Sequence, residues 1–187
     1  IVTQVLVKLP PKPECFQTFL GVFETVEAAS LTVTDIIKAG IVPGALEMMD
    51  QLITRAIEEA YHFGFPLDAG ALLIIELDGP EAGMDQQVQK IESICKQNKA
   101  RELRRAQSEE ERAQLWKCRK RAFGAIGRIS PNYLTQDGVV PRSKLPEIMD
   151  FIQAPSEKVQ LRIPNVFHAG DGNINPLILF DERDPDQ

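Results

Sequence analysis

Short apolar runs alternate with helical hydrophobic patterns along most of the chain. Apolar runs predict strands, and apolar residues recurring every three or four positions predict helices. The almost continuous run at 71–77, Ala-Leu-Leu-Ile-Ile-Glu-Leu, predicts a central strand. Strands are predicted over 2–9, 16–24, 43–49, 71–77, 102–106, 133–140, 163–167 and 177–180, and helices over 26–39, 51–62, 84–97, 108–126 and 144–153.

Local capping signals support several of these helices. Asp50 stands immediately before an apolar helical pattern, where an aspartate caps the first turn. Ser108 is followed three residues later by Glu111, which is the pattern of a capping box. Gly40 follows another helical pattern and predicts its end.

The order of the predicted elements favours an α+β fold. Between residues 16 and 106 the order is β-α-β followed by β-α-β, with one additional helix between the two units. This order is typical of a ferredoxin-like split βαβ arrangement. We therefore expect ferredoxin-like units that form a large antiparallel sheet with helices on one face.

Composition is ordinary for a globular protein. Of 187 residues, 43% are hydrophobic and 26% are charged, enough for one sizeable core. The net charge of −6 argues against a nucleic-acid partner. Three cysteines without metal spacing or a CxxC motif indicate reduced thiols in a cytosolic compartment. No apolar run reaches about 18 residues, so no transmembrane helix is predicted.

The stretch 167–176 contains the most distinctive polar cluster. His168, Asp171 and Asn173 lie in a glycine-rich turn between two apolar runs, which predicts a hairpin. Gly170 and Gly172 permit positive φ and the close approach of a ligand. Two interpretations are open: a ligand-facing corner, or an Asp-Gly turn with a partly buried histidine.

Arg119 lies in a cationic cluster on a predicted helix. Lys117 and Arg121 share one helix face, whereas Arg119 lies nearly opposite, within a turn of Trp116 and Phe123. A guanidinium that points toward a core needs a carboxylate partner, from the protein or from a ligand. The alternative is a solvated basic surface.

Other polar positions have plainer interpretations. Alternation along the strand at 133–140 places Thr135 and Asp137 on one face, as on an ordinary edge strand. Glu47 and Asp50 are interpreted as part of a helix cap beside core methionines. His62 is expected at the surface.

Several stretches together resemble a known family. They are Ala-Leu-Glu-Met-Met-Asp at 45–50, Leu-Trp-Lys-Cys-Arg-Lys at 115–120, Asp-Gly-Val-Val-Pro-Arg at 137–142 and His-Ala-Gly-Asp-Gly-Asn at 168–173. They resemble, in the same order, the C-terminal cap domain of FAD-linked oxidases of the vanillyl-alcohol-oxidase type. Within that group they are most similar to FAD-binding subunits of glycolate oxidase, which are related to D-lactate and D-2-hydroxyglutarate dehydrogenases.

The resemblance implies a flavoprotein oxidoreductase that transfers hydride from C2 of a 2-hydroxy acid to FAD. It implies that Arg119, with Thr135 and Asn175, binds the substrate and that His168 is catalytic. The turn formed by Gly170, Asp171, Gly172 and Asn173 is implied to contact the cofactor. Metal-dependent relatives bind a divalent metal at the position of His168. Asn175 replaces the second histidine of that pattern, and asparagine is a poor zinc ligand, which argues against this metal site.

The resemblance also implies how the chain is organised. Residues 1–12 are expected to be the last strand and linker of a preceding FAD-binding domain, and 13–187 a substrate (cap) domain truncated at its C-terminus. FAD would be bound mainly by the missing domain, so the fragment alone is expected to be inactive.

The expected partners are a small 2-hydroxy acid, an electron acceptor and other oxidase subunits. A cytoplasmic location is expected, with peripheral attachment to the inner face of the membrane through partner subunits as a variant of it. The alternative function is a non-catalytic ferredoxin-like binding or subunit-docking domain.

Overall fold

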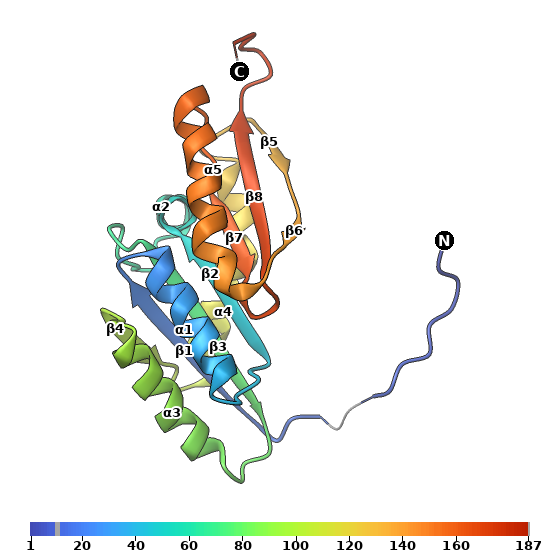
Figure 1. Ribbon diagram of the computed structural model, residues 1–187, viewed down its shortest axis with the longest axis vertical. Helices are drawn as coiled ribbons and strands as arrows, with labels where there is room; N and C mark the ends of the chain where they lie inside the picture. The colour runs from blue at the N-terminus through green and yellow to red at the C-terminus, as the bar shows by residue number, and fades with distance from the viewer. Residues whose placement is uncertain (10–11, 187) are drawn as a thin grey trace.

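The computed structural model describes residues 1–9 and 12–186, and within them one antiparallel sheet organises the fold (Figure 1). The strands are β1 (Cys15–Phe23), β2 (Ala45–Asp50), β3 (Ala71–Gly79), β4 (Glu102–Arg105), β5 (Asn132–Thr135), β6 (Gly138–Val139), β7 (Asn165–His168) and β8 (Asn173–Phe180). The helices are α1 (Val26–Lys38), α2 (Gln51–Tyr61), α3 (Met84–Gln97), α4 (Glu109–Ile126) and α5 (Leu145–Val159), with short 3₁₀ helices η1 (Arg142–Lys144) and η2 (Ala169–Asp171).

The sheet combines a ferredoxin-like half with an added hairpin. Its order is β4-β1-β3-β2-β7-β8-β5, and β6 also pairs with β8. The first four strands, with α1 and α3, form the split βαβ arrangement, and α2 is the additional helix. The β7–β8 hairpin extends this half because β7 pairs antiparallel with β2. The predictions of an α+β class and a large antiparallel sheet are therefore confirmed.

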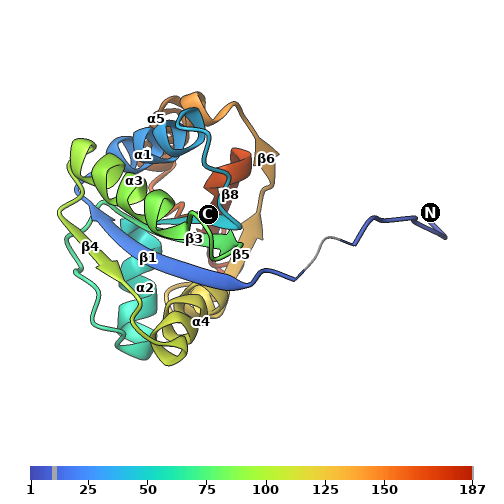
Figure 2. The ribbon, with the colours of Figure 1, turned by 90° about the horizontal axis from the view of Figure 1, so that it is seen from below.

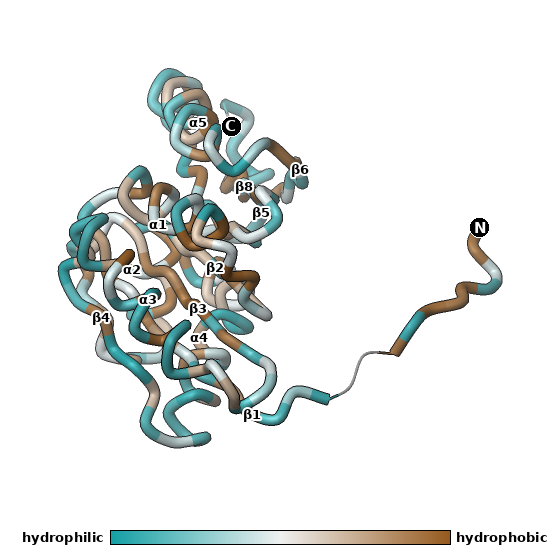
Figure 3. The backbone as a smooth tube through the Cα atoms, turned by 60° about the horizontal axis from the view of Figure 1, so that its bottom comes forward, coloured by the Kyte–Doolittle hydropathy of each residue, from teal (hydrophilic) through white to brown (hydrophobic). Residues whose placement is uncertain are grey.

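Helices cover both faces of the sheet, so the prediction that they lie on one face is wrong (Figure 2). Apolar residues of α1, α3 and α5 pack in one core and those of α2 and α4 in the other. The reason is visible in β3, where Leu73 and Ile75 enter the first core while Leu72 and Ile74 enter the second. A strand buried on both faces needs a continuous apolar run, because alternate side chains point to opposite sides. The apolar positions of β2 and β3 accordingly lie inside the molecule (Figure 3).

The predicted helix caps are present. The Asp50 carboxylate accepts from the backbone N–H of Ile53 at 2.9 Å and from that of Asn165 at 2.7 Å. Burial raises the pKa of Asp50 to about 6, against the opposing effect of these hydrogen bonds. The Ser108 hydroxyl accepts from the N–H of Glu111 at 3.2 Å. Asp50 therefore joins the start of α2 to β7, beyond its role as a cap.

The strand predicted over 133–140 is interrupted between β5 and β6, although both pair with β8 in one register. Gln136 donates its N–H to the carbonyl of Pro176 at 2.9 Å. Proline has no N–H to return a second bond, so the ladder is broken at this point.

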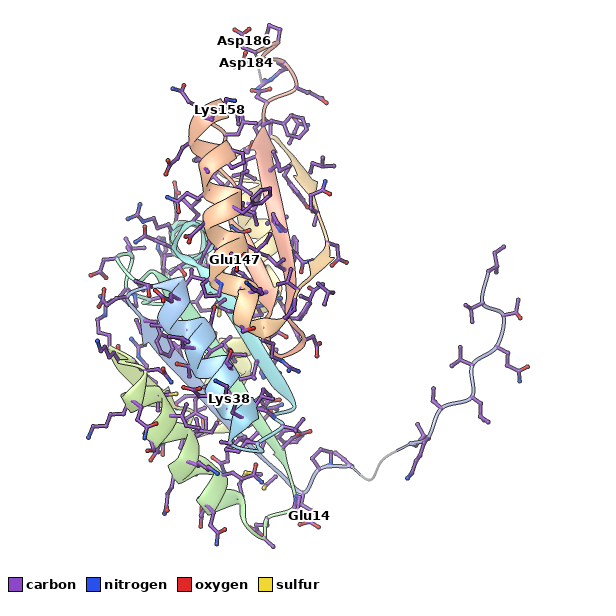
Figure 4. All side chains as sticks on the ribbon, in the orientation of Figure 1. Glu14, Lys38, Glu147, Lys158, Asp184 and Asp186 are labelled. Carbon is purple, nitrogen blue, oxygen red and sulfur yellow. The ribbon has the colours of Figure 1, made fainter. Side chains whose placement is uncertain are left out.

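Two other boundaries differ from prediction. Helix α5 runs to Val159, beyond the predicted end at 153, and it continues through Pro155 although a proline usually stops a helix. Glu147 and Lys158 mark its two ends in Figure 4. The strand predicted over 2–9 is absent: residues 1–9 are exposed and extend away from the sheet, without pairing with any of its strands (Figure 1). Pro10 and Pro11, predicted to begin the linker, lie outside the described residues.

Within the described residues, no helix has both the length and the apolar character needed to cross a bilayer.

Candidate active site

Three charged or titratable side chains converge where β2, β7 and α4 meet. The Oε2 atom of Glu47 accepts from Nε of Arg119 at 2.9 Å and lies 2.8 Å from its Nη2. The Oε1 atom of the same carboxylate lies 2.8 Å from Nδ1 of His168. Glu47 and Arg119 are 8% and 7% exposed, whereas the His168 side chain is 51% exposed. The cluster is thus a buried ion pair with a histidine at its open side.

Strand register places these residues together. Glu47 pairs directly with His168 across β2 and β7, so both side chains point to the same face of the sheet. This is the face covered by α2 and α4, because Met49 and Val166, two residues away along each strand, are buried in that core. Arg119 reaches Glu47 from α4.

Of the two interpretations left open for Arg119, the structure supports the one in which its guanidinium points toward the core, and its partner is a protein carboxylate. Its neighbours Lys117, Lys120 and Arg121 are exposed, as on a solvated basic surface. In the cationic segment 117–121, the buried ion pair and the solvated basic surface are therefore both present, in different residues. Arg119 belongs to the polar cluster, and the other three belong to the surface.

A second polar group lies on the same face, next to His168. Asn173 and Asn175 donate their side-chain N–H groups to Oδ1 of Asp137 at 2.6 and 3.2 Å. Asn173 pairs with His168 in the β7–β8 ladder, and Thr135 pairs with Leu177 in the β5–β8 ladder. Because alternate residues of β8 share a face, the structure brings Asn173, Asn175 and Thr135 to the His168 side of the sheet.

The turn between β7 and β8 is held by the segment that follows β6. Gly172 has a φ of +72°, and a Cβ there would lie 2.1 Å from the Val140 carbonyl oxygen. The N–H of Val140 donates to the carbonyl of Gly172 at 2.9 Å, and Arg142 donates to that of Gly170 at 2.5 Å. The hairpin prediction is confirmed, and Gly172 has an internal structural role. The contact of this turn with the cofactor stays a prediction.

A small hollow lies beside the turn. It has a volume of about 150 Å³, and its polar lining includes Glu47, Arg142, His168 and Asp171. Ile37 and Leu46, which also line the hollow, belong to the core of α1, α3 and α5, so the hollow reaches the opposite side of the sheet from the Glu47–His168 contact.

The donors do not fit the divalent metal of the metal-dependent relatives. Within residues 1–9 and 12–186, no three His, Cys, Asp or Glu side chains converge as metal ligands. Asn175 contributes an amide at the second histidine position, and this amide is hydrogen-bonded to Asp137. We therefore derive no step through a metal.

The sequence did not reveal the roles of two buried glutamates, of which only Glu47 belongs to the candidate site. Glu47 links Arg119 to His168, and Glu76 of β3 accepts from Thr18, Arg112 and Trp116 at 2.6–2.8 Å. Burial would raise the pKa of Glu76, but these hydrogen bonds outweigh it and hold the pKa below its usual range. The available signal was a single charge inside each apolar strand, because a buried charge requires a partner.

Comparison with known proteins identifies the family. The family model for FAD linked oxidases, C-terminal domain, matches residues 12–187. The chain belongs to this family. It is 48% identical over 185 residues to the glycolate oxidase subunit GlcD of Escherichia coli K12, with 99% of the chain and 37% of the relative aligned. It is 40% identical to the GlcD subunit of Bacillus subtilis, with 100% of the chain and 40% of the relative aligned.

More distant relatives extend the family. A probable mitochondrial D-lactate dehydrogenase of Danio rerio is 29% identical, with 100% of the chain and 38% of the relative aligned. The chain thus spans less than half the length of these relatives. Among solved structures, 4-ethylphenol oxidase from Gulosibacter chungangensis has a TM-score of 0.64 at 13% identity, covering 96% of this chain and 42% of that one. A p-cresol methylhydroxylase has the same TM-score and identity, covering 94% and 41%. Both support the fold of the FAD-linked oxidase C-terminal domain.

Proposed function

We propose that this chain is the substrate-binding domain of a flavin-dependent 2-hydroxy-acid dehydrogenase, whose parent protein oxidises glycolate or D-lactate. The observation that carries the proposal is the Arg119–Glu47–His168 cluster, which puts an oriented guanidinium and a half-exposed imidazole at one place. The family membership and the GlcD relatives support the same chemistry.

In this proposal residues 1–12 end a preceding FAD-binding domain and 13–187 form the cap. FAD is bound mainly by that other domain, and when bound it supplies the acceptor for the hydride from C2. The turn Gly170–Asn173 lies against the cofactor. The fragment alone is inactive because it lacks most of the FAD site.

The residues of the chain bind and orient the substrate. Arg119 holds the substrate carboxylate, because a guanidinium matches the planar geometry of a carboxylate and remains charged. His168 hydrogen-bonds the C2 hydroxyl and serves as the catalytic group that this chain contributes. Thr135 and Asn175, on the same sheet face, contact the substrate from β5 and β8.

The proposed partners are the 2-hydroxy acid, an electron acceptor and other oxidase subunits. The name of the GlcD relatives, which are subunits, supports an assembly of several chains. We place the parent protein in the cytoplasm; peripheral attachment to the inner face of the membrane through partner subunits is the variant of this location.

The test is anaerobic reduction of the flavin in the full-length parent protein. The absorbance of oxidised flavin, at about 450 nm, should fall when glycolate or D-lactate is added. Arg119→Lys should raise the apparent substrate KM by about 30-fold or more, because lysine lacks the planar fork. Lys120→Ala, at an exposed neighbouring position, is the matched control and should leave the KM unchanged.

A second candidate follows from Asn175, which departs from the family pattern. It is a cap that binds or docks without catalysis. Bound flavin that neither acid reduces would favour this candidate, and a parent protein without flavin would contradict both.

A further inference from the structure

Glu47 serves two partners with separate oxygen atoms. Its Oε2 contacts Nε and Nη2 of Arg119, and its Oε1 contacts Nδ1 of His168. The carboxylate is buried and lies on β2, in the interior of the sheet between β3 and β7. A rigid strand therefore fixes the acceptor that both side chains share.

The contact with Arg119 leaves one edge of the guanidinium available. Nε and Nη2 point to Glu47, and within the described residues Nη1 has no hydrogen-bond acceptor. A carboxylate that binds a guanidinium along one edge also fixes the plane of the group. Glu47 thus determines the direction in which Arg119 presents its remaining donors.

The contact with His168 selects a tautomer. Because Glu47 forms an ion pair with Arg119, its carboxylate accepts hydrogen bonds, and Nδ1 of His168 must carry the proton. In the neutral ring the lone pair is then on Nε2. The imidazole is half exposed, so a neutral Nε2 is the atom offered to a ligand as a hydrogen-bond acceptor.

We propose that Glu47 is a positioning residue that sets the tautomer of His168 and the orientation of Arg119 with a single carboxylate. The functional part of this inference rests on the proposed function, since it assigns Arg119 to the substrate carboxylate and Nε2 of His168 to the C2 hydroxyl. Nε2 accepts the hydroxyl hydrogen bond, which it can do only while the proton is on Nδ1.

The first measurement reads the tautomer on this chain, which buries both of its cores without another segment. The chain has two histidines, so ¹⁵N-histidine labelling gives two ring systems in a long-range ¹H–¹⁵N spectrum. In its neutral state, the His168 ring should show the Nδ1–H form. Glu47→Gln should abolish that preference, and Glu47→Asp, which keeps the carboxylate, should restore it in part. The exposed His62 should be unchanged in every variant.

The second measurement uses the flavin-loaded parent protein. Glu47→Gln should lower kcat/KM for the acid that reduces the flavin by about 10- to 100-fold, the usual effect of a lost supporting hydrogen bond. Glu47→Asp should recover part of that loss. Glu58→Gln changes another buried glutamate, on α2, whose Oε2 accepts from the N–H of Gly64, and it should have no effect.

The two measurements separate the inference from the proposed function. Two results overturn the inference even if the parent oxidises a 2-hydroxy acid. One is an Nε2–H tautomer at His168 in the unmodified chain, and the other is an Nδ1–H preference that persists in Glu47→Gln. If His168 shows the predicted tautomer but the parent protein oxidises neither acid, the positioning role is supported and the proposed reaction is contradicted.

Discussion

Nε1 of Trp116 on α4 donates a 2.6 Å hydrogen bond to Oε2 of Glu76 on β3. Arg112, one turn earlier, donates to both oxygens of the same carboxylate. Residues 112, 116 and 119 are spaced by four and three, so they share one helix face. Since Arg119 binds Glu47 on the adjacent strand, two buried carboxylates attach α4 to the sheet.

Removing the carboxylate of Glu76 should destabilise the domain. Glu76→Ala leaves Arg112 and Trp116 without their common acceptor, and the free energy of unfolding should fall by about 2–3 kcal/mol. Urea denaturation followed by tryptophan fluorescence measures this, because the chain has one tryptophan, Trp116. Glu109→Ala removes the surface partner of Arg112 and is the control, with an expected loss below about 1 kcal/mol. Equal losses in the two variants would contradict the anchoring role.

The same carboxylate should make stability depend on pH. The pKa of Glu76 is lowered in the folded state, so its contribution is present above the ordinary carboxyl pKa. That contribution is lost as the pH falls through the folded-state value, where the carboxyl becomes protonated. The difference in unfolding free energy between the unmodified chain and Glu76→Gln should therefore shrink on acidification. A difference that grows as the pH falls would show that the sign is wrong.

Gly172 should be intolerant of a side chain. Gly172→Ala places a Cβ against the Val140 carbonyl in addition to imposing a left-handed conformation on alanine, and we expect a loss of about 3 kcal/mol or more. Gly40→Ala is the matched control: its φ is +77° but no atom lies within 4 Å of the added Cβ. Its expected loss is about 1 kcal/mol. The difference in unfolding free energy between the two variants, measured by thermal unfolding, gives the cost of the contact between the added Cβ and the Val140 carbonyl. Similar losses of stability in both variants would show that this contact is unimportant.

Asn175→His should create a metal site. His168 and residue 175 lie on one face of neighbouring strands in diagonal positions, and the contact between Glu47 and Nδ1 already orients the first ring. We expect the variant to bind Zn²⁺ at least about 10-fold more tightly than the unmodified chain. Isothermal titration with Zn²⁺ measures the affinity. The double variant with His168→Ala should lose the gain, and a gain that survives it would place the metal elsewhere.

Local patterns predicted most of the elements and part of the site. The helix predicted over 84–97 is α3, and the capping residues Asp50 and Ser108 were recognised, because these signals reside in a few neighbouring residues. Helical spacing separated Arg119 from Lys117 and Arg121 and made an inward direction one of two open interpretations. Its partner could not be predicted, because Glu47 and Arg119 are 72 residues apart and only strand order brings them together.

The distribution of the helices was also beyond local patterns. The apolar run of β3 correctly identified a central strand. A strand that is apolar on both faces also needs helices on both faces of the sheet, and the prediction of helices on one face did not follow this consequence.

The β2–β7 pairing also bears on how the domain folds. It joins residues as far apart as Glu47 and His168, whereas β1 to β4 pair over shorter separations. Closing a longer loop costs more chain entropy, so contacts of this kind tend to form after the local ones. The ferredoxin-like half is therefore expected to assemble first, and the polar cluster to appear only when the hairpin docks on its edge. In hydrogen exchange, amides of β7 should exchange before those of β3, so that opening of the hairpin breaks the Glu47–His168 contact while most of the sheet remains folded.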